Sequence, residues 1–133
     1  MLHHISFGVA DLRHSAAFYD AALGALGYVR VWSDFEGDAN DQAVGYGRAG
    51  GGDKFAIKQR TASPIVAPEG FHLAFAAESH EAIHRFHAAA VANGGTDNGG
   101  PGPRPHYGPN YYAAFVIDPD GYHVEVVMNA PVA

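Results

Sequence analysis

The stretch Phe115-Val-Ile-Asp-Pro-Asp-Gly-Tyr-His-Val-Glu-Val-Val127 decides the fold. Its two apolar runs predict strands, because β-branched and aromatic residues are enriched in sheets. The segment 118–121 between them predicts a tight turn, in which proline presets φ and glycine accepts a positive φ. Glu125 interrupts the second apolar run, and a carboxylate is costly to bury without a partner. The hairpin therefore raises the question of which groups Glu125 faces.

The chain repeats itself with a constant shift of 68 residues. His4 falls on His72, and Gly27 falls on Gly95, with no gap over this region. Each copy begins with an alternating strand pattern, at 2–9 and at 70–77, and continues with a capped helical pattern that carries an apolar stripe. Carried to the end of the copy, the same shift places Ile57 opposite Glu125. The sequence therefore predicts two copies of one βαβββ unit.

These patterns predict an α+β fold. We expect the two tandem βαβββ modules to form a curved, mainly antiparallel half-barrel sheet with the helices outside. Module 1 spans about 1–62, a linker with two prolines spans about 62–69, and module 2 spans about 70–130, so that 1–133 forms a single domain. The segment 96–109 contains four prolines and four glycines, which predicts a stiff, mostly coil segment of the kind that often carries binding residues.

Composition narrows the classes of partner. Apolar residues make up 47% and charged residues 17% of the 133 residues, which is typical of a folded globular chain. The formal charge is −6 and no run of Lys or Arg occurs, so we expect neither a nucleic-acid nor a membrane partner. The absence of cysteine excludes disulfides and a thiol nucleophile. With no signal-peptide pattern and no long apolar stretch, we expect a cytoplasmic protein.

Strand alternation brings three ligand-type residues to one face of the sheet. In each of their strands the apolar neighbours must face the helices, so His4, His72 and Glu125 point away from them. Two histidines and one carboxylate leave coordination positions open for water and substrate, as catalytic metal sites require. The pattern predicts a divalent ion such as iron, manganese, nickel, cobalt or zinc. The alternative is two histidines and a buried glutamate that simply form hydrogen bonds.

The segments His4-Ile-Ser-Phe-Gly-Val-Ala-Asp11, Ala17-Phe-Tyr19 and Asp118-Pro-Asp-Gly-Tyr-His-Val-Glu125 resemble the vicinal oxygen chelate superfamily. This superfamily includes glyoxalases, bleomycin-resistance proteins, fosfomycin-modifying enzymes and extradiol dioxygenases. The resemblance covers essentially the whole chain. It implies paired modules around a divalent metal, a small oxygenated substrate that chelates this metal, and a homodimer in which ligands can come from both subunits.

The resemblance places the metal ligands at His4, Ile57, His72 and Glu125. Isoleucine can neither bind a metal nor transfer a proton, which argues against glyoxalase I chemistry and favours a dioxygenase-like or a transferase- or lyase-like enzyme. The superfamily also has members that only bind ligands, without a metal. A metal-free protein that sequesters a small molecule, of the bleomycin-resistance type, is therefore the alternative.

Other residues are candidates for the walls and the chemistry of the pocket. His106 and Tyr107 are the candidate acid/base residues, and Arg104 suits an anionic group of the substrate. The other reading of this cluster is a set of strand-edge aromatics and a solvated arginine. The full set of predicted substrate-binding residues is Phe55, Ile57, Gln59, Arg104, Tyr111, Tyr112 and His123.

The segment His80-Glu-Ala-Ile-His84 matches the helical motif of zinc proteases. The buried stripe of its helix is set by Ile83 and Phe86, which leaves His80 and His84 largely toward solvent. We therefore interpret this motif as a solvated helix face rather than as a metal site.

Overall fold

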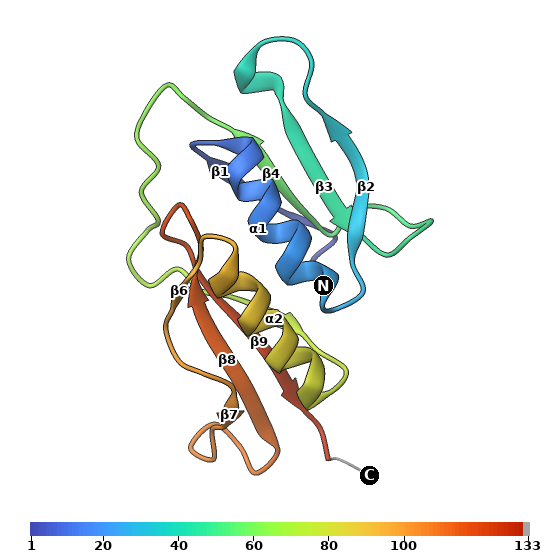
Figure 1. Cartoon of the computed structure of the whole chain (residues 1–133), viewed down its shortest axis with the longest axis vertical. Coiled ribbons are helices and arrows are strands. Elements are labelled where there is room, and N and C mark those ends of the chain that lie inside the picture. Colours follow the sequence, from blue (N-terminus) through green and yellow to red (C-terminus); the bar gives the residue numbers. More distant parts are fainter. Residues whose placement is uncertain (132–133) are drawn as a thin grey trace.

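Two helices lie side by side, with the strands behind them (Figure 1). The computed structural model describes residues 1–131. The first half of the chain contributes β1 (Ile5–Val9), α1 (Leu12–Gly24), β2 (Val29–Asp34), the short 3-10 helix η1 (Ala39–Asp41), β3 (Ala43–Gly47) and β4 (Phe55–Gln59). The second half contributes β5 (Leu73–Ala76), α2 (His80–Ala92), β6 (Thr96–Asp97), β7 (Gly102–Pro103), β8 (Tyr111–Ile117) and β9 (His123–Asn129).

The strands form two separate sheets. Their orders are β1-β4-β3-β2 and β5-β9-β8-β6, with β7 paired to β8. The edge pairs β1–β4 and β5–β9 are parallel, and the other pairs are antiparallel. Within residues 1–131 neither sheet closes into a barrel. The predicted α+β fold, with mainly antiparallel strands and helices on one side, is confirmed.

Side-chain caps start both helices where the sequence predicts. Asp11 accepts a hydrogen bond from the backbone N–H of His14, and Ser79 accepts one from the backbone N–H of Ala82. Each bond satisfies one of the free donors of a first helical turn. The first helix ends at Gly24, and the chain then turns through Gly27, whose φ of +84° suits a residue without a Cβ.

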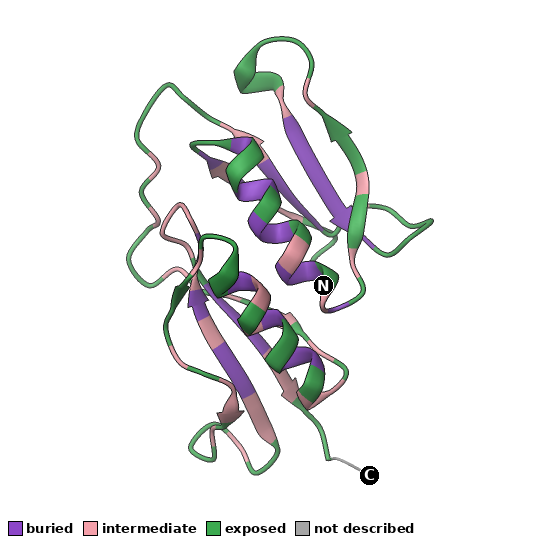
Figure 2. Ribbon diagram, viewed as in Figure 1, coloured by how far each residue is buried: buried purple, intermediate pink, exposed green. Residues whose placement is uncertain are grey.

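One hydrophobic core runs between the helices and the strands and spans both halves of the chain (Figure 2). Aromatic rings connect the halves. The Phe55 ring lies 4.9 Å from that of Phe7 and 5.4 Å from that of Phe75, which in turn lies 6.3 Å from Phe86. Such edge-to-face and tilted pairs add to the stabilisation from burial. The two halves are therefore packed as one body.

The turn between β8 and β9 docks onto the first half of the chain. Asp120 accepts hydrogen bonds from the Ala10 backbone N–H at 2.9 Å and from the Ser15 hydroxyl at 2.8 Å. Close by, the Tyr122 hydroxyl donates to the Gly8 carbonyl at 2.7 Å. The turn that the sequence predicts is thus also a polar joint between the two halves.

The most buried bond of this joint links Asp118 to Tyr19 of α1. The Tyr19 hydroxyl donates to Oδ2 of Asp118 at 2.5 Å, and both residues are buried. Burial raises the pKa of Tyr19 well above its usual value, and the neighbouring Asp118 carboxylate raises it further. Burial also raises the pKa of Asp118, although the hydrogen bond from Tyr19 acts in the opposite direction. Each polar group compensates for the lost hydration of the other.

The constant shift of the internal repeat does not hold up to the last strand of each copy, where the two copies differ by one residue in register. Ala74 pairs with Glu125 in the second sheet, and Ser6, the repeat equivalent of Ala74, pairs with Ala56 in the first. The counterpart of Glu125 is therefore Ala56. The predicted equivalence of Ile57 and Glu125 is wrong, because a one-residue slip in register turns a side chain to the other face of the sheet.

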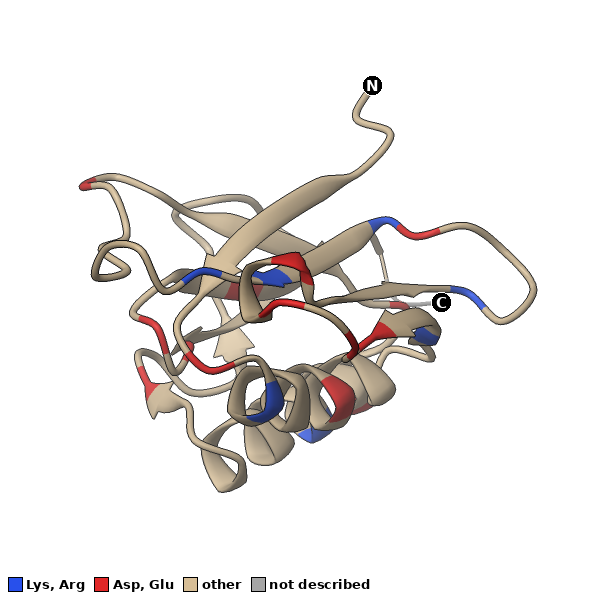
Figure 3. Cartoon of the chain, turned by 90° about the horizontal axis from the view of Figure 1, so that it is seen from above, with Lys and Arg blue, Asp and Glu red and all other residues tan. Residues whose placement is uncertain are grey.

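Figure 3 shows acidic and basic residues dispersed over the surface rather than gathered in one patch. The same view shows the helices on one side of the strands and the N-terminal segment extending away on the other side. In the part of the chain that the structure describes, no helix has the length and apolar character needed to cross a membrane.

The joint between the halves predicts a stability effect. Replacing Tyr19 by phenylalanine leaves one oxygen of the buried Asp118 without its donor, so we expect the free energy of unfolding to fall by about 1–3 kcal/mol. Urea denaturation measures this change. Tyr28→Phe is the control, because Tyr28 is only half-buried and its hydroxyl has no hydrogen-bond partner within residues 1–131. Equal losses in the two variants, or none in either, would contradict the proposed importance of the joint.

Candidate functional site

Glu125 lies on the face of the second sheet that points away from α2. Its neighbours Val124 and Val126 belong to the core, so alternation turns Glu125 to the opposite face. The residue is nevertheless only 3% exposed. Oε1 lies 2.6 Å from Nε2 of His72, and Oε2 accepts a hydrogen bond from the Tyr111 hydroxyl. The carboxylate is thus buried between two polar partners.

Strand register brings these partners together. Ala74 of β5 lies beside Glu125, so His72, two residues earlier, shares its face. Phe115 of β8 lies opposite Glu125, and Tyr111, four residues earlier, also shares that face. The predicted common face of His72 and Glu125 follows directly from the alternation pattern.

Tyr111 is held in its neutral form by this arrangement. Burial raises its pKa to about 12, and the hydrogen bond to Glu125 and the charge of that carboxylate act in the same direction. At neutral pH the hydroxyl is therefore a fixed donor to Glu125. It orients the carboxylate and leaves the other oxygen toward His72.

The third predicted ligand is not brought to this pair. Within residues 1–131 no three His, Asp or Glu side chains are placed so that they can hold a metal ion. His4 is exposed on the N-terminal segment, and its Nδ1 lies 2.9 Å from Nδ1 of His3. The side chain of His72 is 46% exposed, so one edge of the pair remains open to solvent. The single chain therefore presents two of the three expected ligands.

Two cavities flank the pair. One, of about 410 Å³, is lined by His72, His123 and the segment 67–71. The other, of about 320 Å³, is lined by Arg104, His106, Tyr107 and Phe115, among others. The ring of Phe115 lies 6.0 Å from that of His72 and so borders both the pair and the second cavity. Phe115 thus separates the predicted residues of the proline- and glycine-rich segment from the His72–Glu125 pair.

Arg104 is largely occupied in shaping its own loop. Its guanidinium donates to the carbonyls of Gly100 at 2.8 Å and Gly102 at 3.0 Å, and it stacks over the Phe115 ring at 5.4 Å. These bonds hold the loop against β8. The outer edge of the cavity is formed by His106 and Tyr107, whose rings are 4.1 Å apart and exposed.

Three predicted substrate-binding residues lie on the other face of the first sheet. Phe55 and Ile57 are buried in the core against the helices. Gln59 accepts a hydrogen bond from the Leu12 backbone N–H at 2.7 Å and donates to the Ala10 carbonyl, which anchors the start of α1. The prediction that Phe55, Ile57 and Gln59 form a wall around the metal is wrong. The one-residue change of register in β4 turns these side chains to the opposite face of the sheet.

Tyr112 also points away from Glu125, toward α2. Its hydroxyl lies 2.7 Å from Nε2 of His84, and its ring stacks on that of His80 at 3.8 Å. Tyr112 therefore does not belong to the surroundings of Glu125, because adjacent residues of a strand face opposite sides. Together with Tyr111 it lines a separate cavity beside His80. The contacts with His84 and His80 engage both histidines of the helical protease-like motif.

Phe115 also borders the His72–Glu125 pair, although it was not among the predicted site residues. It lies opposite Glu125 across the β8–β9 ladder and contacts both His72 and Arg104. The signal is present in the sequence, because Phe115 follows Tyr111 at an even spacing and must share its face.

A protein-family model matches most of the chain. The model described as "Glyoxalase/Bleomycin resistance protein/Dioxygenase superfamily" matches residues 1–126, nearly the whole chain. The chain belongs to this superfamily. No curated protein sequence matches the chain closely enough to add to this assignment.

Solved structures of the superfamily share the fold. A glyoxalase/bleomycin resistance protein from Albidiferax ferrireducens T118 is 35% identical, with 93% of this chain and 94% of that chain covered and a TM-score of 0.75. A glyoxalase-related enzyme from Fulvimarina pelagi is 22% identical, covers 100% and 92%, and has a TM-score of 0.71. A glyoxalase I variant from Zea mays is 21% identical over 95% of this chain and 45% of that chain, with a TM-score of 0.74.

The Tyr111–Glu125 bond predicts an alkaline titration. In the folded protein Tyr111 keeps its proton to about pH 12, whereas an ordinary tyrosine loses it near 10.0. Between these values only the unfolded chain releases the proton, so the free energy of unfolding falls as the pH rises. Glu125→Gln removes the charge, and we expect the pKa of Tyr111 to move back toward 10. Tyrosine Cζ resonances measure the titration, and Tyr111→Phe assigns the signal. An unchanged pKa in Glu125→Gln would contradict the coupling.

Proposed function

We propose that this member of the superfamily is a divalent-metal-dependent enzyme acting on a small oxygenated substrate that chelates the metal through neighbouring oxygens. The observation that carries the proposal is the 2.6 Å approach of His72 Nε2 to Glu125 Oε1 on the face away from the helices. Both atoms are metal-ligand types, and they occupy two of the positions that the superfamily resemblance assigns to ligands.

The donor set fits a first-row transition metal. One imidazole and one carboxylate, joined by a second imidazole, suit iron, manganese, nickel, cobalt or zinc. A bound cation of this kind supplies a Lewis acid that polarises a coordinated oxygen. Tyr111 keeps the Glu125 carboxylate oriented, in the manner of hydrogen-bond partners that support metal ligands elsewhere. The other side of His72 is open to solvent, because its side chain is 46% exposed.

We assign the third ligand to His4 of a second copy. Two observations support this assignment. His4 is exposed, and the N-terminal segment extends away from the body on the side opposite the helices (Figure 3). Members of the superfamily often form dimers, and a symmetric dimer would place the N-terminal segment of each copy against the partner. Each site would then combine His72 and Glu125 of one subunit with His4 of the other.

The reaction class follows from the absence of a second carboxylate in the first half of the chain. The first-module counterpart of Glu125 is Ala56, which can neither bind a metal nor transfer a proton. This disfavours glyoxalase I chemistry and leaves dioxygenase-like or transferase- or lyase-like chemistry. His106 and Tyr107, exposed at the rim of the adjoining cavity, are the candidates for proton transfer to a substrate.

A metal-free binding protein is the second candidate, and one observation favours it. Both oxygens of Glu125 have hydrogen-bond partners without a metal, so the buried carboxylate is already compensated. This candidate would use the flanking cavities to hold a small molecule and would need no third ligand. Its ligand affinity would survive Glu125→Gln.

Metal content separates the two candidates. We expect protein purified without chelator to carry a transition metal, and His72→Ala and Glu125→Gln to lower the metal content at least about tenfold, because each loses a ligand. Elemental analysis by mass spectrometry measures it. His123→Ala is the matched control, since His123 lines the cavity next to His72 without contacting Glu125, and it should keep its metal. Equal and negligible metal in all four proteins would overturn the enzyme proposal.

A further inference from the structure

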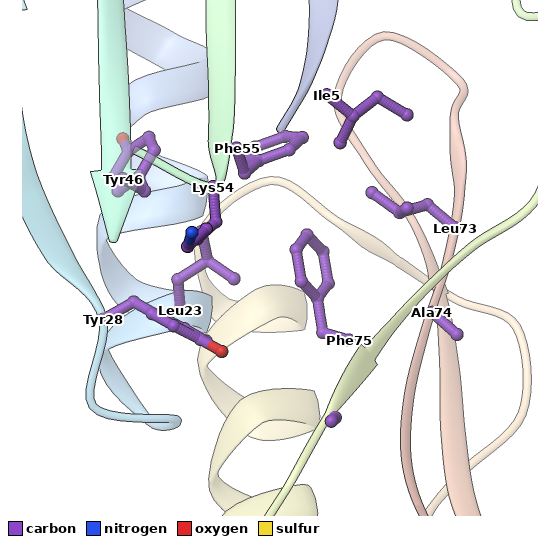
Figure 4. Close-up of a pocket in the computed structure, with 10 residues that line it drawn as sticks. Ile5, Leu23, Tyr28, Tyr46, Lys54, Phe55, Leu73, Ala74 and Phe75 are labelled. Atoms are coloured by element: carbon purple, nitrogen blue, oxygen red, sulfur yellow. The ribbon is translucent and has the colours of Figure 1, made fainter. Parts of the chain in front are cut away.

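A separate cleft lies between the two halves of the chain (Figure 4). It has a volume of about 210 Å³. Its walls come from the end of α1, the start of β4 and the whole of β5, with Ile5, Leu23, Tyr28, Tyr46, Lys54, Phe55, Leu73, Ala74, Phe75 and Ala76 as lining residues. Ala74 pairs with Glu125 in the β5–β9 ladder and Leu73 follows His72 in the chain, but neither His72 nor Glu125 lines the cleft. The cleft is therefore distinct from the proposed metal site.

The interior of the cleft is apolar. Phe55 and Phe75 stand edge to face at 5.4 Å, and Leu23 and Leu73 complete the walls (Figure 4). Phe55 and Leu23 are buried in the core, so the walls are held firmly. Concave sites with apolar walls and a few polar groups are the usual form of small-molecule sites. The walls of this cleft are apolar in the same way.

The polar part consists of Lys54 and two tyrosines, of which Tyr46 already donates its hydroxyl to Asp20 at 2.9 Å. Lys54 lies beside Tyr28 and Leu23 in the cleft (Figure 4). Within residues 1–131 its ammonium forms no salt bridge, and the Tyr28 hydroxyl has no hydrogen-bond partner. Two carboxylates of the surroundings are already paired. Asp20 is bound to Arg30 at 2.8 Å, and Glu78 is paired with Arg48 at 3.5 Å.

Arg48 closes one side of this polar end. Its guanidinium lies 4.5 Å from the centre of the Tyr28 ring and donates to the Leu26 carbonyl at 3.0 Å. Its pairing with Glu78 links the first half of the chain to the loop that follows β5. Tyr28 is thereby fixed with one ring face covered, and its hydroxyl remains available next to Lys54.

We propose that this cleft binds a small organic monoanion with an aromatic or branched apolar body, such as an arylalkyl carboxylate. The apolar body lies against the rings of Phe55 and Phe75, and the carboxylate pairs with Lys54 and accepts a hydrogen bond from Tyr28. The volume corresponds to about seven water molecules, which is enough for a ring and a short chain. Release of water from the apolar walls favours binding, and the charge selects an anion over a neutral analogue.

Binding of this kind goes beyond the proposed function, because it uses neither a metal nor His72 and Glu125. The walls come from both halves of the chain, so an occupied cleft also holds the two halves in one arrangement. We therefore expect the ligand to raise the melting temperature of the whole protein, as any ligand that binds only the folded state must.

The test uses 3-phenylpropionate as the probe and the full-length protein in the oligomeric state in which it is purified. We expect saturable binding with a Kd on the order of 1 mM, as for a ligand of this size. Isothermal titration and amide chemical shifts measure it, and the shifts should centre on Phe55, Phe75 and Lys54. Lys54→Met should weaken binding roughly fivefold, the scale of a partly exposed ion pair.

Two controls make the test specific. Lys58→Met removes a lysine from the same strand that does not line the cleft, and it should leave the Kd unchanged. The neutral 3-phenylpropionamide should bind wild type and Lys54→Met equally weakly. Absence of saturable binding, shifts centred on His72 and Glu125, or equal effects of the two lysine substitutions would each overturn the proposal.

Discussion

The hydrogen bond from Tyr19 to the buried Asp118 joins the two halves of this chain. Asp118 opens the turn that leads into β9, and its carboxylate is buried and needs a hydrogen-bond donor, so the turn docks where α1 supplies one. Docking of the turn fixes the start of β9 and therefore the position of Glu125 four residues beyond its glycine. The position of the His72–Glu125 pair thus depends on a joint that lies on the opposite side of the sheet.

Strand register determines which residue of each half occupies the position of Glu125. In the second sheet the residue beside Ala74 is Glu125, and in the first sheet the residue beside Ser6 is Ala56. In the first half, Ala56 of β4 occupies the position that corresponds to Glu125, and its neighbours Phe55 and Ile57 belong to the hydrophobic core. The second half keeps a carboxylate there and surrounds it with His72 and Tyr111. One half therefore supplies packing, and the other supplies the polar site.

Much of this arrangement could be predicted from the sequence. Helix caps at Asp11 and Ser79, the hairpin at 115–127 and the shared face of His72 and Glu125 all follow from local rules of capping, turns and alternation. The position of Ile57 could not be predicted, because the shift between copies grows by one residue before β4, and only strand pairing reveals it. Tyr112 was misplaced because the sequence alone did not fix which of two adjacent tyrosines faces Glu125.

His4 remains a prediction, because a single chain leaves it apart from the pair. The most direct measurement is subunit complementation between His4→Ala and Glu125→Gln. If each site combines both subunits, neither variant alone binds metal, and after random reassortment about one quarter of the sites are intact again. Metal content per subunit should therefore recover to about a quarter of the wild-type value. Metal retained by His4→Ala alone, or no recovery in the mixture, would contradict a site shared between two copies.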